Sequence, residues 1–199
     1  MILRTPLSLS VFFLLLAPLA AHAQLGVYGT VTVEHPSGIH CQEAICGSND
    51  GTISPLGGFG GVYYDFRTVG PVRLGLDVRA GSTVGNKNAA IYASTPRPRI
   101  FSVLGGVRAS FHTPLPQLRP YVEGAIGLGK SNIAQPQEVD GTVSYRSGLQ
   151  YSGFAGVDLT LLPVMDFRVV ELGAGGLQNF GNTYAVTSIS TGLVFHLPF

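Results

Sequence analysis

The end of the chain alternates strictly between two kinds of position. From Ser188 onward, one face holds Ile189, Thr191, Leu193, Phe195, Leu197 and Phe199, and the other holds Ser190, Gly192, Val194, His196 and Pro198. A period of two is typical of a β-strand, whose successive side chains point to opposite faces. The apolar face continues to the last residue, whereas the ends of water-soluble domains tend to fray. The pattern therefore predicts a terminal strand with one face in lipid.

Seven earlier segments show the same two-residue period, and turn-forming residues separate them. The chain contains 27 Gly and 13 Pro, and no stretch has the 3.6-residue apolar period of a long helix. The predicted strands cover about residues 24–34, 55–66, 72–81, 100–112, 120–129, 144–161, 167–175 and 183–199. We therefore predict an all-β fold, an eight-stranded antiparallel up-and-down transmembrane β-barrel.

The connections between these segments alternate in length. Those at residues 68–70, 113–118 and 162–166 are short, and those at about 35–54, 82–99, 130–143 and 176–182 are mostly longer and polar. Short turns on one rim and longer loops on the other are typical of outer-membrane barrels. Both termini then lie on the short-turn rim, which faces the periplasm.

Nearly every charge in the predicted strands falls on one face. This inward set contains four arginines and six acids: Glu34, Asp65, Arg73, Asp77, Arg79, Arg108, Glu123, Asp158, Arg168 and Glu171. A water-soluble barrel would place its apolar residues inside instead. An arginine facing the bilayer midplane costs about 2–4 kcal/mol. The charges are therefore predicted to form a paired network in the lumen that acts as a plug, with a narrow ion path as the alternative.

Two details of the strand pattern lead to further expectations. Arg168 and Glu171 are three residues apart, so strict alternation would place one of them in lipid, and we expect a β-bulge near Val169 and Val170. Aromatic side chains are expected at the two membrane interfaces. Those predicted near the periplasmic side are Tyr64, Phe66, Phe111, Tyr121, Phe167 and Phe199, and Tyr151 is predicted near the outer side.

The first 23 residues have the pattern of a cleaved secretory signal. Arg4 is their only charge, an apolar run follows, and Ala21-His22-Ala23 supplies small residues around the cleavage point. The alternative is a membrane anchor, but this run is broken by Pro18 and shorter than the roughly 20 residues that a spanning helix needs. We expect residues 1–23 to be the signal peptide and residues 24–199 to form the outer-membrane barrel domain.

Composition and charge narrow the set of partners. The chain is 45% hydrophobic and 12% charged, with a net charge of +1, which argues against a nucleic-acid partner and favours lipid. Cys41 and Cys46 are expected to form a disulfide because an exported protein meets an oxidising compartment. The alternative is a metal site completed by His35 and His40, but four residues between the cysteines fit a zinc site poorly.

The sequence contains no recognisable catalytic or nucleotide-binding motif. A catalytic site on the outer rim would need an acid or a nucleophile near a histidine, and His35, His40 and Asp50 are the only candidates. We therefore expect neither an enzyme nor a bound cofactor.

The last strand carries a resemblance to a known family. With an aromatic end and apolar residues at alternate positions before it, the chain resembles the small OmpA/OmpX-type outer-membrane barrels. In that family such a strand is read by the barrel-assembly machinery, and Leu193, Phe195 and Phe199 match the pattern, whereas Pro198 departs from it. The resemblance implies a monomer in the bacterial outer membrane.

The expected function is a structural or surface-interaction role through the extracellular loops. Two alternatives remain at this point. One is a narrow porin-like channel for small solutes or ions, which the polar lumen would allow. The other is a soluble periplasmic β-protein, against which the placement of the charges argues.

Overall fold

The computed structural model describes residues 24–37, 54–85, 99–132, 145–179 and 181–197. These residues form one closed barrel in which every strand pairs antiparallel with its neighbours in the sequence, and β8 pairs with β1. The predicted eight-stranded up-and-down barrel is therefore confirmed. Residues 1–23, which were predicted to be a signal peptide, lie outside the described residues, as do both cysteines, Pro198 and Phe199.

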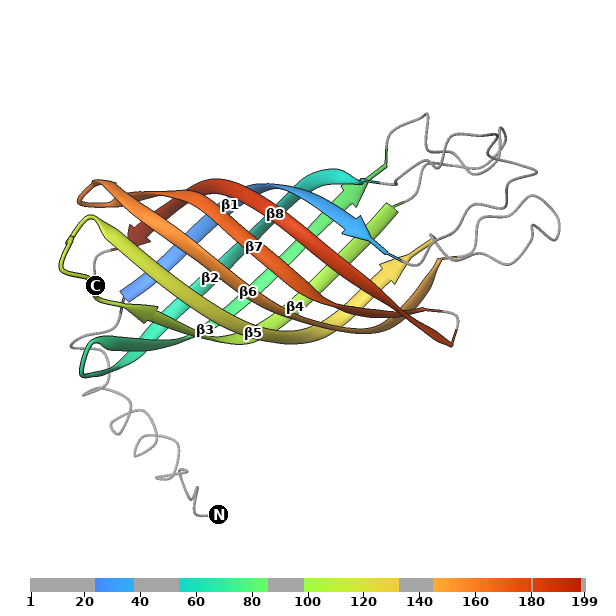
Figure 1. Cartoon of the computed structure of the whole chain (residues 1–199), viewed down its shortest axis with the longest axis horizontal. Coiled ribbons are helices and arrows are strands. Elements are labelled where there is room, and N and C mark those ends of the chain that lie inside the picture. The colour runs from blue at the N-terminus through green and yellow to red at the C-terminus, as the bar shows by residue number, and fades with distance from the viewer. Residues whose placement is uncertain (1–23, 38–53, 86–98, 133–144, 180, 198–199) are drawn as a thin grey trace, which may run out of the picture.

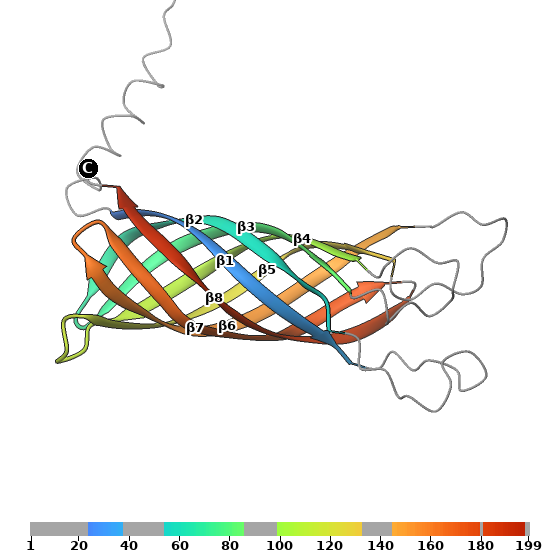
Figure 2. The same cartoon turned by 90° about the horizontal axis from the view of Figure 1, so that it is seen from above.

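The strands run obliquely around the barrel (Figures 1 and 2). Their bounds are β1 Gln24–Pro36, β2 Leu56–Val69, β3 Val72–Val84, β4 Arg99–Phe111, β5 Leu118–Ser131, β6 Arg146–Leu162, β7 Met165–Asn179 and β8 Asn182–Leu197. Each has 13 to 17 residues, more than the roughly 9–11 that a tilted strand needs to cross a bilayer. No helix within the described ranges is long and apolar enough to span a membrane.

The barrel has two different rims. At the terminal rim β1 begins at Gln24 and β8 ends at Leu197, and three short connections join β2 to β3, β4 to β5 and β6 to β7. At the opposite end, the loop rim, three longer connections leave the strands, spanning residues 37–55, 85–98 and 132–145. Figure 1 shows the terminal rim on the left and the loop rim on the right.

The fourth connection at the loop rim differs from the prediction. A longer loop was expected over residues 176–182, but β7 and β8 stay paired as far as Asn179 and Asn182. Gly181 has a φ of 81°, a conformation that glycine adopts without steric cost and that tight hairpins use. The strands therefore end in a short turn, and only three long connections leave this rim.

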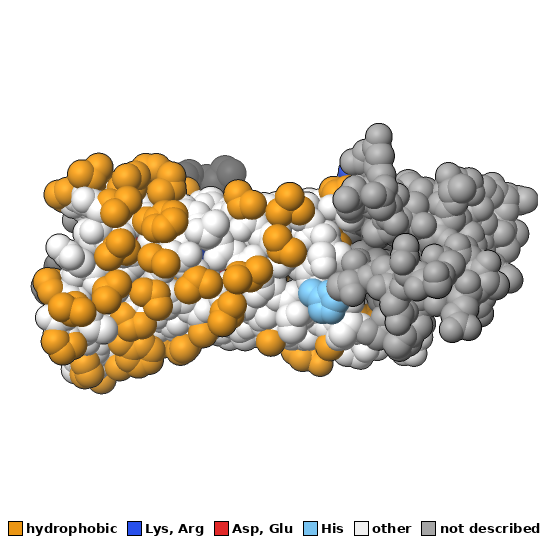
Figure 3. Space-filling view, turned by 45° about the horizontal axis from the view of Figure 1, so that its top comes forward, with side chains coloured by type: hydrophobic (Ala, Val, Ile, Leu, Met, Phe, Trp, Pro, Cys, Tyr) orange, Lys and Arg blue, Asp and Glu red, His pale blue; other side chains and the backbone are white. Residues whose placement is uncertain are grey.

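Alternation sorts the side chains between the lumen and the outer surface. In β3, Leu76 and Val78 are 52% and 59% exposed, whereas Asp77 and Arg79 are 1% and 2% exposed. In the view of Figure 3, hydrophobic side chains are spread over the described part of the barrel surface and no carboxylate is visible. The outer surface is therefore apolar and the lumen polar, as the pattern of charges predicted.

Register shifts at three places interrupt the regular pairing of the strands. The register between β7 and β8 shifts between Arg168 and Glu171, which confirms the predicted bulge at Val169 and Val170. The other two shifts were not predicted from the sequence, and they lie between Asp65 and Arg67 in β2 and between Thr160 and Leu162 in β6. The shift in β2 leaves Asp65 buried in the lumen and Arg67 exposed at the terminal rim.

Candidate functional site

Arg79 lies at the centre of the lumen and binds carboxylates from three strands. Its Nη2 is 2.7 Å from Glu123 Oε2 in β5, its Nη1 is 2.9 Å from Glu171 Oε1 in β7, and its Nε is 3.3 Å from Asp77 Oδ1 in β3. The side chain is 2% exposed, so these ion pairs are shielded from water. A guanidinium suits this position because its planar fork donates several hydrogen bonds at once.

A second arginine, Arg168, continues the network toward the terminal rim. It donates from Nε to Asp158 Oδ1 at 2.9 Å and from Nη1 to Glu171 Oε2 at 3.1 Å. Asp158 also accepts a hydrogen bond from Arg108 Nη2 at 2.7 Å. Three arginines and four carboxylates thus form one continuous cluster, hereafter the central network: Arg79, Arg108, Arg168, Asp77, Glu123, Asp158 and Glu171.

Aromatic rings pack against the arginines of the central network. The Arg108 guanidinium lies between Tyr63 and Tyr121, 4.1 Å and 3.9 Å from their ring centroids. Arg79 lies 4.0 Å from the centroid of Phe154. Rings at these distances attract the cations and fill space beside them, each contact contributing about 0.5–2 kcal/mol. Two tyrosine hydroxyls also donate hydrogen bonds to the network, from Tyr28 to Asp77 and from Tyr121 to Glu171.

A smaller cluster occupies the lumen near the terminal rim. His196 Nε2 lies 2.7 Å from Asp166 Oδ2, and His196 Nδ1 lies 3.3 Å from the Tyr63 hydroxyl. Arg119 approaches the same Asp166 oxygen at 3.4 Å. These contacts connect the end of β8 to β2, β5 and β7, and they therefore fasten the closing strand from inside the barrel.

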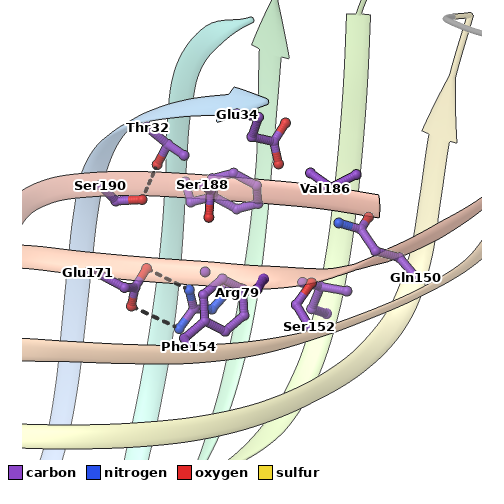
Figure 4. Close-up of a pocket in the computed structure, with 14 residues that line it drawn as sticks. Thr32, Glu34, Arg79, Gln150, Ser152, Phe154, Glu171, Val186, Ser188 and Ser190 are labelled. Atoms are coloured by element: carbon purple, nitrogen blue, oxygen red, sulfur yellow. Dashed lines mark hydrogen bonds and ion pairs between the residues drawn. The ribbon is translucent and has the colours of Figure 1, made fainter. Parts of the chain in front are cut away.

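The lumen on the loop-rim side of the central network is polar but mostly uncharged (Figure 4). Thr32 and Ser190 share a hydrogen bond of 2.8 Å, and the Thr83 hydroxyl donates to Glu34. A cavity of about 10 Å³ lies between these groups and the Arg79–Glu171 pair. That volume is about the least that a single water molecule needs. Nearer the rim, Ile100, Leu177 and Val186 form a buried apolar cluster.

The structure brings most of the predicted charged residues together. Nine of the ten are buried in the lumen: Glu34, Asp65, Asp77, Arg79, Arg108, Glu123, Asp158, Arg168 and Glu171. Arg73 is the exception, since it is half-buried near the terminal rim and lies 3.8 Å from Asp65. Glu34 stands apart from the central network, with Thr83 as its hydrogen-bond partner.

The other predicted site residues are on the outside or beyond the described chain. Leu193 and Phe195 are 40% and 47% exposed on the outer face of β8. Phe199, the third residue of the predicted assembly signal, lies outside the described residues, as do Cys41 and Cys46. His35, one of the alternative metal or catalytic residues, is exposed at the loop rim, and His40 and Asp50 are not described.

The positions of several lumen residues were not predicted from the sequence. Tyr121 was predicted at the periplasmic interface, but it is 1% exposed inside the barrel, so that prediction is wrong. The strand alternation itself could have placed it there, because Tyr121 shares a face with Glu123. Asp166 was assigned to a turn, whereas β7 already begins at Met165 and Asp166 is buried.

The described residues contain no group of three or more His, Cys, Asp or Glu side chains arranged to hold a metal ion. The carboxylates of the central network instead face arginines, and cations supplied by the chain itself occupy the space between them.

Comparison with known proteins gives a likeness in structure alone. No protein-family model matches the chain, and no curated protein matches it. Solved structures of outer-membrane proteins do match.

Neisserial surface protein A superposes with a TM-score of 0.55 at 12% identity, over 87% of this chain and 96% of that one. Ail, the attachment invasion locus protein of Yersinia pestis, solved with the heparin analogue sucrose octasulfate, gives 0.51 at 13% identity, over 88% and 97%. A major outer membrane protein of Thermus thermophilus gives 0.50 at 11% identity, over 88% and 99%. The chain therefore has the fold of the small eight-stranded transmembrane β-barrels.

Proposed function

We propose that this chain is a bacterial outer-membrane barrel that is sealed by its own side chains and serves a structural or surface-interaction role through its loop rim. The observation that carries the proposal is the contact of Arg79 with Glu123 and Glu171 across the lumen. These ion pairs join strands β3, β5 and β7, so side chains cross the full width of the barrel.

The central network supports a sealed lumen rather than a channel. A permeating ion would have to displace buried ion pairs, and breaking one such pair by removing a partner costs about 3–5 kcal/mol. The cavity beside Arg79 measures about 10 Å³, which leaves no room for a hydrated ion. An eight-stranded barrel has an interior that side chains just fill, and here they do so with paired charges and aromatic rings.

The outer-membrane placement rests on the apolar outer surface together with the two rims. Exposed apolar side chains on all eight strands suit contact with lipid, and the closed ring of strands leaves no free edge for pairing with another chain. We place the terminal rim in the periplasm and the three long connections outside the cell, by the usual asymmetry of such barrels. The barrel is proposed to act as a monomer.

The proposal assigns no catalytic reaction to the chain. His196 has both an acidic and a phenolic partner, but its side chain is 7% exposed and lies within the lumen near the terminal rim. A lipid or protein substrate on the outer surface would not reach it.

Planar-bilayer recording tests the sealed lumen. The refolded full chain is first shown to be inserted, by a gel shift between unheated and boiled samples. We then expect no stepwise current across the applied voltage range. Reproducible single-channel steps from the shifted protein would contradict the proposal and favour the narrow porin-like channel. The absence of a heat-dependent shift, with the protein recovered in the soluble periplasm, would contradict the membrane placement itself.

A further inference from the structure

Two cations lie on the outward face of the loop rim, in neighbouring strands. Lys130 of β5 pairs directly with Phe101 of β4, and Arg99 is two positions beyond Phe101 along the same face. The intervening residue, Ile100, pairs with Ser131, and both point into the lumen. Arg99 and Lys130 are therefore diagonal neighbours on the lipid-facing side, and both are exposed.

Toward the middle of the barrel, the next outward-facing residues on these strands are apolar. Val103 pairs with Leu128, and Leu128 pairs with Leu149, and all three are more than 40% exposed. Two aromatic side chains lie at the level of the cations. Phe101 is 46% exposed, and the Tyr145 ring centroid is 5.7 Å from Lys130 Nζ.

This order of side chains sets the depth of the two cations in a bilayer. Aromatic side chains favour the boundary between acyl chains and headgroups, and cations favour the headgroup level just beyond it. Lys130 pairs with Phe101 and therefore lies at the level of this ring, and Arg99 lies one residue step, about 7 Å along the strand, beyond it. Both long side chains can extend from there to the level of the lipid phosphates.

Within the described part of the barrel, no carboxylate lies on the outer face beside this pair. All seven described carboxylates are buried in the lumen: Glu34, Asp65, Asp77, Glu123, Asp158, Asp166 and Glu171. Lys130 contacts the Tyr145 ring, and the backbone N–H of Arg99 donates to Asn132 Oδ1 at 2.7 Å. The charges of both side chains thus face outward.

The cationic pair is confined to one side of the rim. On the described residues of β7, β8 and β1, the outward positions nearest this rim include Gln178, Thr183 and His35, without lysine or arginine. The pair of Arg99 and Lys130 is therefore a local feature rather than part of a uniform ring of basic residues.

We propose that Arg99 and Lys130 bind a phosphate group of an outer-leaflet lipid, whose acyl chains then lie against Val103, Leu128 and Leu149. The guanidinium binds phosphate through two parallel hydrogen bonds, and the ammonium adds a point charge from the next strand. A lipid is the occupant, rather than free phosphate, because the pair faces away from the lumen and borders the apolar row. This inference rests on the proposed outer-membrane placement with the loop rim outward.

The test uses the full-length folded protein in detergent micelles and native mass spectrometry. The probe is lipid A carrying two phosphates, compared with the same glycolipid after removal of its phosphates. A cation near a lipid surface contributes roughly a fivefold gain in binding, so the double variant Arg99→Gln/Lys130→Gln should bind the phosphorylated lipid about 30-fold more weakly. The exchange Arg99→Lys/Lys130→Arg should bind it almost as well as the unmodified chain.

Arg67→Gln is the matched control, because Arg67 is an exposed arginine at the opposite rim. It should bind the probe like the unmodified chain. Equal binding by the Arg99→Gln/Lys130→Gln variant, or by the phosphate-free glycolipid, would overturn the inference. So would displacement of the lipid by equimolar inorganic phosphate or by a soluble sulfated oligosaccharide, since the pair would then recognise a free anion. The heat-dependent gel shift of each variant separates these outcomes from failure of the barrel to fold.

Discussion

Arg168 and Glu171 form an ion pair of 3.1 Å inside the lumen although only two residues separate them in β7. Strict alternation would place them on opposite faces. Val169 has no partner in β6, where Val157 pairs with Val170 and Asp158 with Arg168, and this extra residue returns Glu171 to the lumen. The Thr191 hydroxyl donates to the Arg168 carbonyl at 2.9 Å, which satisfies a backbone group at the bulge.

Deleting Val169 should leave the barrel folded. The deletion removes the unpaired residue, and Arg168 and Glu171 then face the lumen in a regular strand. We expect the free energy of unfolding in lipid vesicles to change by no more than about 1–2 kcal/mol. Deleting Leu172 is the control, because it moves every residue from Gly173 to Gln178 to the opposite face. Loss of the heat-dependent gel shift in the first variant, or its retention in both, would contradict this account of the bulge.

Replacing Arg79 should strongly destabilise the barrel. Arg79→Leu leaves Asp77, Glu123 and Glu171 without the cation between them, and an uncompensated buried charge costs about 3–5 kcal/mol. Denaturant unfolding of the vesicle-inserted protein measures the change. Arg67→Gln, an exposed arginine at the terminal rim, should change the same free energy by less than about 0.5 kcal/mol. Equal stability of the two variants would show that the central network does not hold the barrel together.

His196 should stabilise the closed barrel through its side chain. His196→Phe removes the contacts with Asp166 and the Tyr63 hydroxyl and leaves those buried groups with fewer partners, at a cost of about 1–3 kcal/mol. His112→Phe is the matched control, because His112 is exposed at the same rim. Unfolding free energies for the two variants should differ by at least about 1 kcal/mol. Superimposable unfolding curves for the two variants would show that the His196 side chain does not stabilise the closed barrel.

Removing Phe199 should slow assembly in the cell. Leu193 and Phe195 are exposed on the outer face of β8, and Phe199 extends the same alternating pattern at the end of the sequence. If the assembly machinery reads this pattern, the truncated chain should accumulate unfolded, as measured by the fraction of heat-shifted protein over time after induction. Phe111→Ala, which removes an exposed aromatic from β4 at the same rim, should assemble normally. Equal rates for both would argue against recognition of the terminal residue.

Alternation made most of the barrel predictable from the sequence. Because charge and hydrophobicity follow a period of two, residues such as Asp77 and Arg79 could be assigned to the lumen without knowledge of the fold. Their partners could not be assigned. Arg79 meets Glu171 only because the sheet closes, and closure brings together strands that are not hydrogen-bonded neighbours.

The wrong or missing predictions have three different causes. The length of the β7–β8 connection depends on how far strand pairing continues past polar residues. The polar composition of this segment predicted a longer loop, whereas Gly181 allows a tight turn. By residue type, Tyr121 could be either an interfacial ring or a lumen residue. Its position in the two-residue alternation, rather than its residue type, gives the correct assignment to the lumen. The proximity of the rim cations Arg99 and Lys130 could not be predicted from the sequence, because it depends on the register between β4 and β5.

The most direct test of the whole arrangement measures which face of β3 contacts lipid. Nitroxide labels are placed at Leu76 and Val78, one per protein, after Cys41 and Cys46 are replaced by serine, and the chain is inserted into vesicles. Membrane-soluble oxygen should relax both labels more effectively than a water-soluble nickel complex does, and a label at Leu115, exposed in the β4–β5 connection, should show the reverse. Stronger relaxation of the Leu76 and Val78 labels by the nickel complex would mean that the apolar face contacts water, and the membrane-barrel account would be wrong.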